Sequence, residues 1–338
     1  MPRRSTIASW AVSCFLLIAS SCSAADAQGT ITPLPEAISS FGAAICSEHL
    51  YVYGGHTGEA HQHSRDNLST KFVRLKLTDG TEWESLPAEA PLQGLAMVAY
   101  EGKLYRIGGM TARNASDADA DLYSVPDVSR FDPQAKQWER LPSLPEGRSS
   151  HDAVVVGTTL YVLGGWTLNG DGDGTWLSQP VSLDLSADRP AWQTLPEQPF
   201  QRRALAISHL AGKLVAVGGI DADGQVSRDT DIFDPRTGEW STAAALPGEG
   251  LNGFGVTAWN LGGKVYVSGS NGAVYVLESA QAHWREVARL QAPRFFHRLL
   301  PLSPRSLLAV GGAAPAGHRR DVETIQLESA SRAGALFP

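Results

Sequence analysis

Three histidines lie close together and could supply nitrogen ligands to a metal ion, at His56, His61 and His63. Imidazole nitrogens are common ligands of zinc. Their spacings of five and then two residues fit no rigid ligand pair on a helix, so a loop would have to fold around the ion. We expect a solvated polar loop with no bound metal or cofactor, and these three histidines are the candidates if a metal site exists.

A second group of residues could bind an anion. Arg148, Arg203 and Arg294 each stand shortly before an apolar segment of the same kind, and a guanidinium can hold a carboxylate or sulfate through two parallel hydrogen bonds. Trp166 follows a glycine pair and could stack on a sugar ring. The alternative is that these arginines tie neighbouring structural units together. The candidate ligand-binding residues are Arg148, Arg203, Arg294, Trp166, His56 and Asn271.

Composition excludes several classes of partner and fold. The chain has 338 residues, a formal net charge of -7 and 43% hydrophobic residues. A nucleic-acid-binding protein is usually basic, so we expect no nucleic-acid partner. Three cysteines cannot build a disulfide framework. The 34 glycines and 20 prolines favour many short strands joined by tight turns.

The first 27 residues have the order of a secretory signal peptide. Arg3 and Arg4 precede an uncharged apolar run over residues 7–19, and small residues follow at 25–27. We expect cleavage after Ala27 and an exported protein, periplasmic or extracellular. The apolar run is too short for a transmembrane span. An alternative, the less favoured one, makes Cys22 a lipid anchor, although Ala19 stands where a lipoprotein signal usually has Leu.

An internal repeat dominates the rest of the chain. A short apolar segment ending in Gly-Gly recurs at residues 49–55, 103–109, 159–165 and 213–219, with weaker copies at 264–270 and 306–312. A tryptophan followed by Leu-Pro or its remnant recurs between them, at Trp83, Trp138, Trp192, Trp240 and Trp284. Repeats with a period near 50 residues indicate stacked supersecondary units.

Each repeat contains four strand-like runs. In the third repeat they are residues 151–157, 159–165, 181–186 and 191–196. Four antiparallel strands make one blade of a β-propeller. We expect the Gly-Gly pairs to allow close backbone approach near the axis and the tryptophans to pack between blades.

These motifs resemble the Kelch repeat, which combines a Gly-Gly pair, a Phe-Asp-Pro strand, and a Trp followed by Leu-Pro. The middle element is clear at residues 129–133 and 231–235. The resemblance implies an all-β, six-bladed Kelch-type propeller with four antiparallel strands per blade. The sixth repeat lacks a fourth strand, and residues 31–35 match the missing piece, so an N-terminal strand should close the last blade. We expect a propeller over residues 28–328 and a C-terminal tail over 329–338.

Two functions remain open. The first is a secreted binding module that recognises a glycan, peptide or protein through the loops around the central channel. The second follows from a resemblance to the bacterial sialic acid mutarotases, which are exported six-bladed Kelch proteins and would make this chain a sugar mutarotase or epimerase. That family's Arg matches Arg228, but its Glu falls at Ile220, so the adjacent Asp221 would have to act as the acid–base group. The binding module is the favoured hypothesis.

Overall fold

The computed structural model describes residues 31–171 and 173–327. The predicted signal peptide with Cys22, residues 28–30 and 328 at the ends of the predicted propeller, and the predicted tail over 329–338 lie outside this part, so these remain predictions. Among the described residues there is no α-helix, and no helix could cross a membrane.

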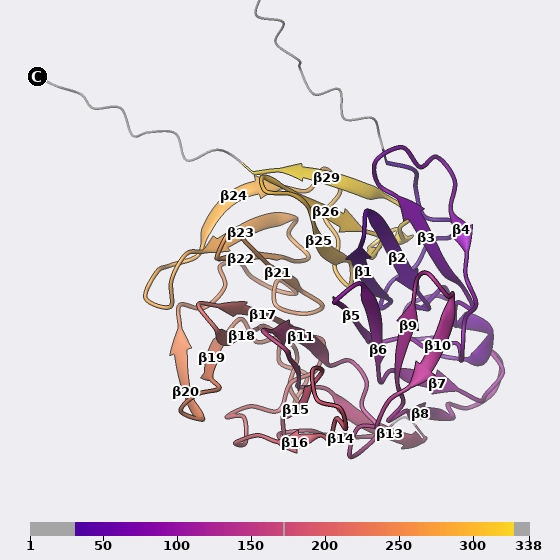
Figure 1. The fold of residues 1–338 in the computed structure, drawn as a ribbon, viewed down its shortest axis with the longest axis horizontal. Helices are drawn as coiled ribbons and strands as arrows, with labels where there is room; N and C mark the ends of the chain where they lie inside the picture. The colour runs from indigo at the N-terminus through magenta and orange to yellow at the C-terminus, as the bar shows by residue number, and fades with distance from the viewer. Residues whose placement is uncertain (1–30, 172, 328–338) are drawn as a thin grey trace, which may run out of the picture. The chain divides into compact units, whose positions relative to one another are not determined.

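Six sheets follow one another along the chain and form the blades, confirming the predicted propeller (Figure 1). Blade 1 contains β1 (Gly42–Cys46), β2 (His49–Tyr53), β3 (Phe72–Lys76) and β4 (Glu84–Ser85). Blade 2 contains β5 (Ala96–Tyr100), β6 (Lys103–Ile107), β9 (Val128–Asp132) and β10 (Gln137–Arg140). Blade 3 contains β11 (Asp152–Val156), β12 (Thr159–Leu163), β15 (Val181–Asp184) and β16 (Gln193–Thr194).

The second half of the ring has the same plan. Blade 4 contains β17 (Ala206–Leu210), β18 (Lys213–Val217), β19 (Thr230–Asp234) and β20 (Glu239–Ala243). Blade 5 contains β21 (Thr257–Leu261), β22 (Lys264–Ser268), β23 (Ala273–Leu277) and β24 (Arg285–Arg289). Blade 6 contains β25 (Arg298–Ser303), β26 (Ser306–Val310) and β29 (Val322–Gln326).

The remaining elements belong to loops on one face, where each blade's second strand leads to its third. They are the 3-10 turn η1 (Arg65–Asn67), β7 (Met110–Ala112), β8 (Leu122–Ser124), β13 (Trp166–Gly170), β14 (Gly174–Trp176), β27 (Ala313–Ala314) and β28 (Gly317–His318). We call this side of the propeller the loop face.

The N-terminal segment completes blade 6, as the sequence predicted. In blade 1, the Leu86 amide of the Leu-Pro motif donates to the carbonyl of Phe72, at the start of the third strand. Leu34 repeats this contact in blade 6, because its amide donates to the carbonyl of Arg320 at 2.8 Å. Residues 31–35 therefore take the fourth place in the blade, although they form no regular strand.

A closed circuit of backbone hydrogen bonds joins all six blades. Its six residues each stand two positions before a blade's first strand, have positive φ, and donate their amide to the carbonyl of the equivalent residue in the previous blade, at 2.7–3.2 Å. The circuit also crosses the seam between blade 6 and blade 1, so it is complete. We call it the axial ring, and its members are Ser40, Gly94, Ser150, Ala204, Gly255 and Phe296.

An ion pair lies next to the axial ring, between the first residues of β11 and β25. Arg298 of blade 6 bonds Asp152 of blade 3 at 3.1 Å, and also donates to the carbonyls of Phe41 in blade 1 and Leu95 in blade 2. The other oxygen of Asp152 accepts the amide of Ile207 in blade 4. Burial raises the pKa of Asp152, and the guanidinium of Arg298 opposes that rise. Together the two side chains connect five of the six blades.

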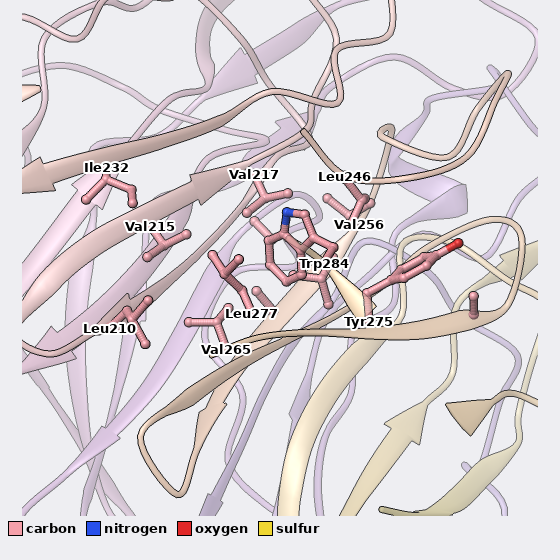
Figure 2. Packing of buried hydrophobic residues seen from close by; sticks show 14 residues of the cluster. Leu210, Val215, Val217, Ile232, Leu246, Val256, Val265, Tyr275, Leu277 and Trp284 are labelled. Atoms are coloured by element: carbon pink, nitrogen blue, oxygen red, sulfur yellow. The ribbon is translucent and has the colours of Figure 1, made fainter. Parts of the chain in front are cut away.

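Hydrophobic cores fill the interfaces between neighbouring blades, and the repeat tryptophans lie at them as predicted. Figure 2 shows Trp284 of blade 5 beside Val217 of blade 4 and Leu246, the leucine of the preceding Leu-Pro motif. The indole N–H of Trp138 donates to the carbonyl of Pro87 in the preceding blade at 2.7 Å. Each repeat tryptophan thus packs at a blade interface, and its one polar atom bonds an acceptor in the preceding blade.

The first glycine of each Gly-Gly pair abuts the next blade, as the sequence predicted. At Gly108, with φ of +55°, a Cβ would lie 2.4 Å from the carbonyl oxygen of Arg148. The amide of Gly109 donates to that same carbonyl at 2.8 Å. A side chain at this position would therefore push two blades apart.

We predict that Gly108→Ala lowers the free energy of unfolding by about 3–5 kcal/mol, as the sum of a left-handed backbone and an overpacked contact. Gly102→Ala is the matched control, because Gly102 lies in the same blade with φ of +72°, and a Cβ there would meet no atom of the described chain within 4 Å. That control should cost only about 1–2 kcal/mol. If urea unfolding shows the same loss of unfolding free energy for Gly108→Ala and Gly102→Ala, the predicted clash between the blades is wrong.

Two histidines occupy positions where other blades have apolar residues. His151 and His297 directly follow the axial ring, where blades 2 and 4 have Leu95 and Leu205. They are 4% and 2% exposed. Burial lowers both pKa values from 6.5 to about 3, and the nearby arginines lower them further. Both rings are therefore neutral in the folded protein, whereas the unfolded chain protonates them near pH 6.5.

We predict that acid destabilises the fold through these two histidines. Because their folded pKa values lie below the unfolded value, their contribution is complete above pH 6.5 and is lost as pH falls towards 3. Each costs about 2 kcal/mol at pH 5. His151→Leu should reduce the loss of unfolding free energy between pH 7.5 and pH 5 by that amount, whereas His283→Leu, at an exposed position, should not. An unchanged loss in His151→Leu would disprove the assignment.

Candidate ligand-binding site at the channel mouth

The loop face is uneven because the loops of blades 2 and 3 build a sheet of their own. Strands β7 and β8 of blade 2 pair with β13 and β14 of blade 3 in the order β14-β13-β8-β7 (Figure 1). This added sheet has its own small core, which includes Leu68 from the loop of blade 1 and Leu168. Blade 5 has only a tight turn at the equivalent place, where the Gly272 amide bonds the carbonyl of Gly269. The rim is therefore high over blades 1–3 and low over blade 5.

Arg203 lies at the mouth of the channel, held by the backbone on both sides. It directly precedes the axial-ring residue Ala204, and its amide and carbonyl pair with Ile220 after the Gly-Gly of blade 4. Its guanidinium carbon is 4.2 Å from the ring centroid of Trp166, 5.5 Å from that of Trp176 and 5.9 Å from that of Phe254. Three blades thus contribute to one cation–π cluster.

Two hydrogen-bond donors in this cluster have no acceptor. Arg203 Nε and Trp166 Nε1 are buried and, within the described residues, bond to nothing. Arg203 also has no carboxylate partner there, unlike its neighbour Arg202, which pairs with Asp231. Burial lowers the pKa of Arg203, but a guanidinium keeps its charge at neutral pH. The Arg203 guanidinium is therefore a partly buried cation that has no anionic partner among the described residues.

A histidine cluster borders this site. The ring of His56 lies 5.0 Å from that of His63 and 5.1 Å from that of His318 in blade 6. Burial lowers the pKa of His63 to about 4, and the charge of Arg203 also contributes, so the ring is neutral at physiological pH. Gln93 bonds the Nδ1 of His63 at 2.9 Å.

The structure changes the membership of the predicted histidine trio. His56 and His63 meet, but His61 is exposed and makes no ring contact, and His318 takes its place. Within residues 31–171 and 173–327, no group of three or more His, Cys, Asp or Glu side chains is arranged to hold a metal ion. The repeat pattern could not reveal His318, since it lies over 250 residues away from His56.

Arg148 and Arg294 were predicted to lie at the mouth of the channel, and the structure corrects this prediction. They are only 2% and 1% exposed. Arg148 donates to the carbonyl of Gly164 at 3.2 Å, and Arg294 donates to that of Gly311 at 3.3 Å and pairs with Glu323. These side chains are therefore buried and bond the backbone of the Gly-Gly segments.

The repeat equivalent of these two arginines is Arg202. Arg148, Arg202 and Arg294 each stand two positions before the axial ring, whereas Arg203 stands one position before it. A shift of one residue in extended backbone reverses the side of the chain that carries the side chain. Of the three arginines expected at the rim, Arg203 alone therefore reaches it.

Two other predicted ligand-binding residues, Asn271 and His56, have local partners. Asn271 caps its own turn, because its side-chain oxygen accepts the Ala273 amide and its amide group donates to the Tyr275 hydroxyl. His56 is 5% exposed and its Nε2 bonds the carbonyl of Glu59 at 3.0 Å. Trp166 lies at the mouth as expected.

The two residues proposed for mutarotase chemistry are not paired. Asp221 accepts the amides of Asp223 and Gln225 at 3.1 and 2.8 Å and so shapes its own turn. Arg228 is exposed and donates to the carbonyl of Gly248. No ion pair joins the two in the described chain.

Sequence reasoning missed an aromatic group beside Arg203. Phe254 and Phe295 stand one position before the axial ring, like Arg203, and Phe296 belongs to the ring itself. Phe296 lies 4.9 Å from Phe254 and 5.0 Å from Phe295 between ring centroids. All three are partly exposed. The sequence did carry a signal, because every other position of the ring has Ser, Gly or Ala.

Comparison with known proteins agrees with this architecture. Residues 94–312 match the family described as the KLHDC2/KLHL20/DRC7 Kelch-repeats domain. Kelch-like protein 34 of Homo sapiens is 28% identical over 52% of this chain and 29% of its own length. Kelch-like protein terF of Aspergillus terreus is 27% identical over 68% of this chain and 49% of its own. The chain thus spans half or less of these curated relatives.

A solved structure, described as "Structure of YjhT", is similar to this protein, and the similarity extends over nearly the whole of the solved chain. It aligns with a TM-score of 0.68 and 17% sequence identity, covering 88% of this chain and 99% of that one. Identity at this level supports the fold alone. The family match covers more than half of the chain, and its repeats are the blades of the structure, so the chain belongs to the Kelch-repeat family.

Proposed function

We propose that this protein is an exported binding module that captures an acidic segment of a protein partner at the mouth of its channel, with Arg203 as the anchor. One observation carries the proposal: Arg203 Nε and Trp166 Nε1 are buried donors without acceptors in the described chain, beside a cation without an anion. Unsatisfied buried donors are costly. A carboxylate of a partner would satisfy them and form the charge-assisted bonds that guanidinium favours.

The surroundings of Arg203 suit a carboxylate that is followed by an apolar side chain. Trp166 and Trp176 hold the guanidinium by stacking, so it is preorganised and little side-chain entropy is lost on binding. Phe254, Phe295 and Phe296 provide an apolar surface next to it. An acidic residue with a hydrophobic neighbour therefore matches the site in charge and polarity.

A protein segment fits better than a sugar. Kelch propellers are commonly protein-binding modules. Stacking on a sugar would need a free face on Trp166, but Arg203 stacks on this ring and the backbone of Gly174 packs so closely that a Cβ there would lie 2.3 Å from it. Both contacts reduce the ring surface that a sugar could use.

Export is part of the proposal and rests on the sequence. The charged, apolar and small-residue order of residues 1–27 is that of a signal peptide, and it would place the propeller in the periplasm or outside the cell. A lipid anchor at Cys22 is the alternative form of the same export. We propose no catalytic step, because Asp221 shapes its own turn and Arg228 bonds the carbonyl of Gly248.

We predict that Arg203→Met weakens binding of acidic peptides by about 10- to 100-fold, the value of one or two hydrogen bonds to a charged group. The measurement is a peptide array in which each Asp- or Glu-containing sequence is paired with its Asn or Gln counterpart, followed by affinity measurement on the best binder. Methionine keeps the alkyl stem of Arg203 but removes the cation, so the stacked aromatic rings should remain folded.

Arg113→Met is the matched control. Arg113 is an exposed arginine of the same face, stacked 3.7 Å from the ring centroid of Tyr123, so its loss removes the same charge away from the unpaired donors. The Arg113→Met protein should bind the acidic peptide with nearly the wild-type affinity. In both proteins this affinity should weaken with rising salt concentration. The proposal is refuted if the neutral peptides bind as well as the acidic ones, or if Arg203→Met binds as well as the wild type. It is also refuted if a parallel array shows binding of acidic glycans alone, since the ligand would then be a sugar and not a protein.

A further inference from the structure

The Arg298–Asp152 pair divides the channel into two separate spaces. Above it, towards the axial ring, lies a small cavity of about 50 Å³ that includes the backbone of Gly94 and Gly255. Below it, towards the face opposite the loops, lies a larger cavity of about 180 Å³. Arg298 contributes to the walls of both. The larger space, which we call the lower chamber, has both members of the ion pair in its wall.

The walls of the lower chamber combine aliphatic side chains with polar ones. They come from the first strands of the blades and include Met97, Val98, Val154, Val155 and Leu300. Pockets that bind small molecules are usually lined in this way, with a few polar groups that fix the orientation. A cavity of about 150 Å³ in another protein holds benzene. The lower chamber thus has room for one ring with one or two substituents.

Trp259 departs from the repeat and lines this chamber. At the same place in the first strands of other blades stand Ala44, Val98, Val154, Ser208 and Leu300. The five repeat tryptophans donate their indole N–H to an acceptor in the preceding blade, as Trp284 does to the carbonyl of Ala244 at 2.9 Å. Trp259 has no hydrogen-bond partner within the described chain and remains partly exposed. It therefore offers both a ring surface and a free donor.

Polar groups stand at the two ends of the chamber and also along its walls, at Ser208 and Thr257. At the inner end, Arg298 uses three of its five N–H groups on Phe41, Asp152 and Leu95, so two remain for a ligand. Its charge is already balanced by Asp152. A second charge would lose its hydration without gaining a counter-ion, so a neutral molecule is favoured. At the outer end, the Asn260 amide bonds the carbonyl of His209 at 2.7 Å.

We propose that the lower chamber is a second binding site, which takes a small neutral aromatic ring carrying one hydroxyl group, a phenol. The ring lies among the aliphatic walls beside Trp259, and its hydroxyl oxygen accepts from the inner guanidinium. The site is on the opposite side of the ion pair from Arg203, so it does not depend on the function proposed for the loop face.

The test uses 4-methylphenol as the probe and the full-length protein. Saturation-transfer NMR and titration calorimetry should show one saturable site with a dissociation constant on the order of 0.1–1 mM. Trp259→Ala should weaken binding by about tenfold or more, and Val98→Phe should abolish it by filling the chamber. Trp259→Phe keeps a ring and should retain most of the affinity.

Three controls make the outcome decisive. Arg203→Met should bind the probe as the wild type does, which separates this site from the loop face. 4-Methylbenzoate, with a negative charge, and inositol, a polar ring, should bind at least tenfold more weakly than the phenol. No saturable binding by the wild type, equal binding of the two control compounds, or undiminished binding by a folded Val98→Phe protein would overturn the proposal. The last variant keeps the test valid even if Trp259→Ala fails to fold.

Discussion

The axial ring is the constraint on which the rest of this propeller depends. Six residues each donate one backbone hydrogen bond and accept one, so the removal of any blade would break two of them. Four of the six are not glycine, yet all have positive φ, a conformation that costs an L-residue about 1–2 kcal/mol. The strain is tolerated because the ring and the blades around it fix this backbone on every side.

The position of a residue relative to the ring also governs whether its side chain packs against the sheets or lies at the mouth. Residues two positions before it lie against the Gly-Gly segments, and Arg148, Arg202 and Arg294 are structural there. Residues one position before it face the mouth, where Arg203, Phe254 and Phe295 lie. Before blades 4 to 6 the position next to the ring is thus partly exposed, whereas Ser39, Gln93 and Ser149 at the same place in blades 1 to 3 are buried. The exposed position can change in character from blade to blade without altering the contacts between blades.

Much of the fold could be predicted from sequence because it depends on regular spacing. The Gly-Gly pairs and repeat tryptophans have fixed roles between blades, and Leu34 could be recognised as the missing leucine of blade 6 by pattern alone. The site was predicted less well. Aligning Arg203 with Arg148 placed it in the wrong register by one residue, and His318 meets His56 only because the ring closes. A repeat motif gives the position of a residue along the chain and not the direction of its side chain.

The Arg298–Asp152 pair shows how a symmetric framework acquires a distinct interior. The equivalent positions in the other first strands are Gly42, Ala96, Ala206 and Thr257, which are small and leave the axis open. One arginine and one aspartate fill that space, and each also bonds the backbone of other blades. Because a half-removed buried pair leaves an unpaired charge, both members must be kept together. The pair lies between the small cavity near the axial ring and the lower chamber, so one symmetric scaffold encloses two spaces with different walls.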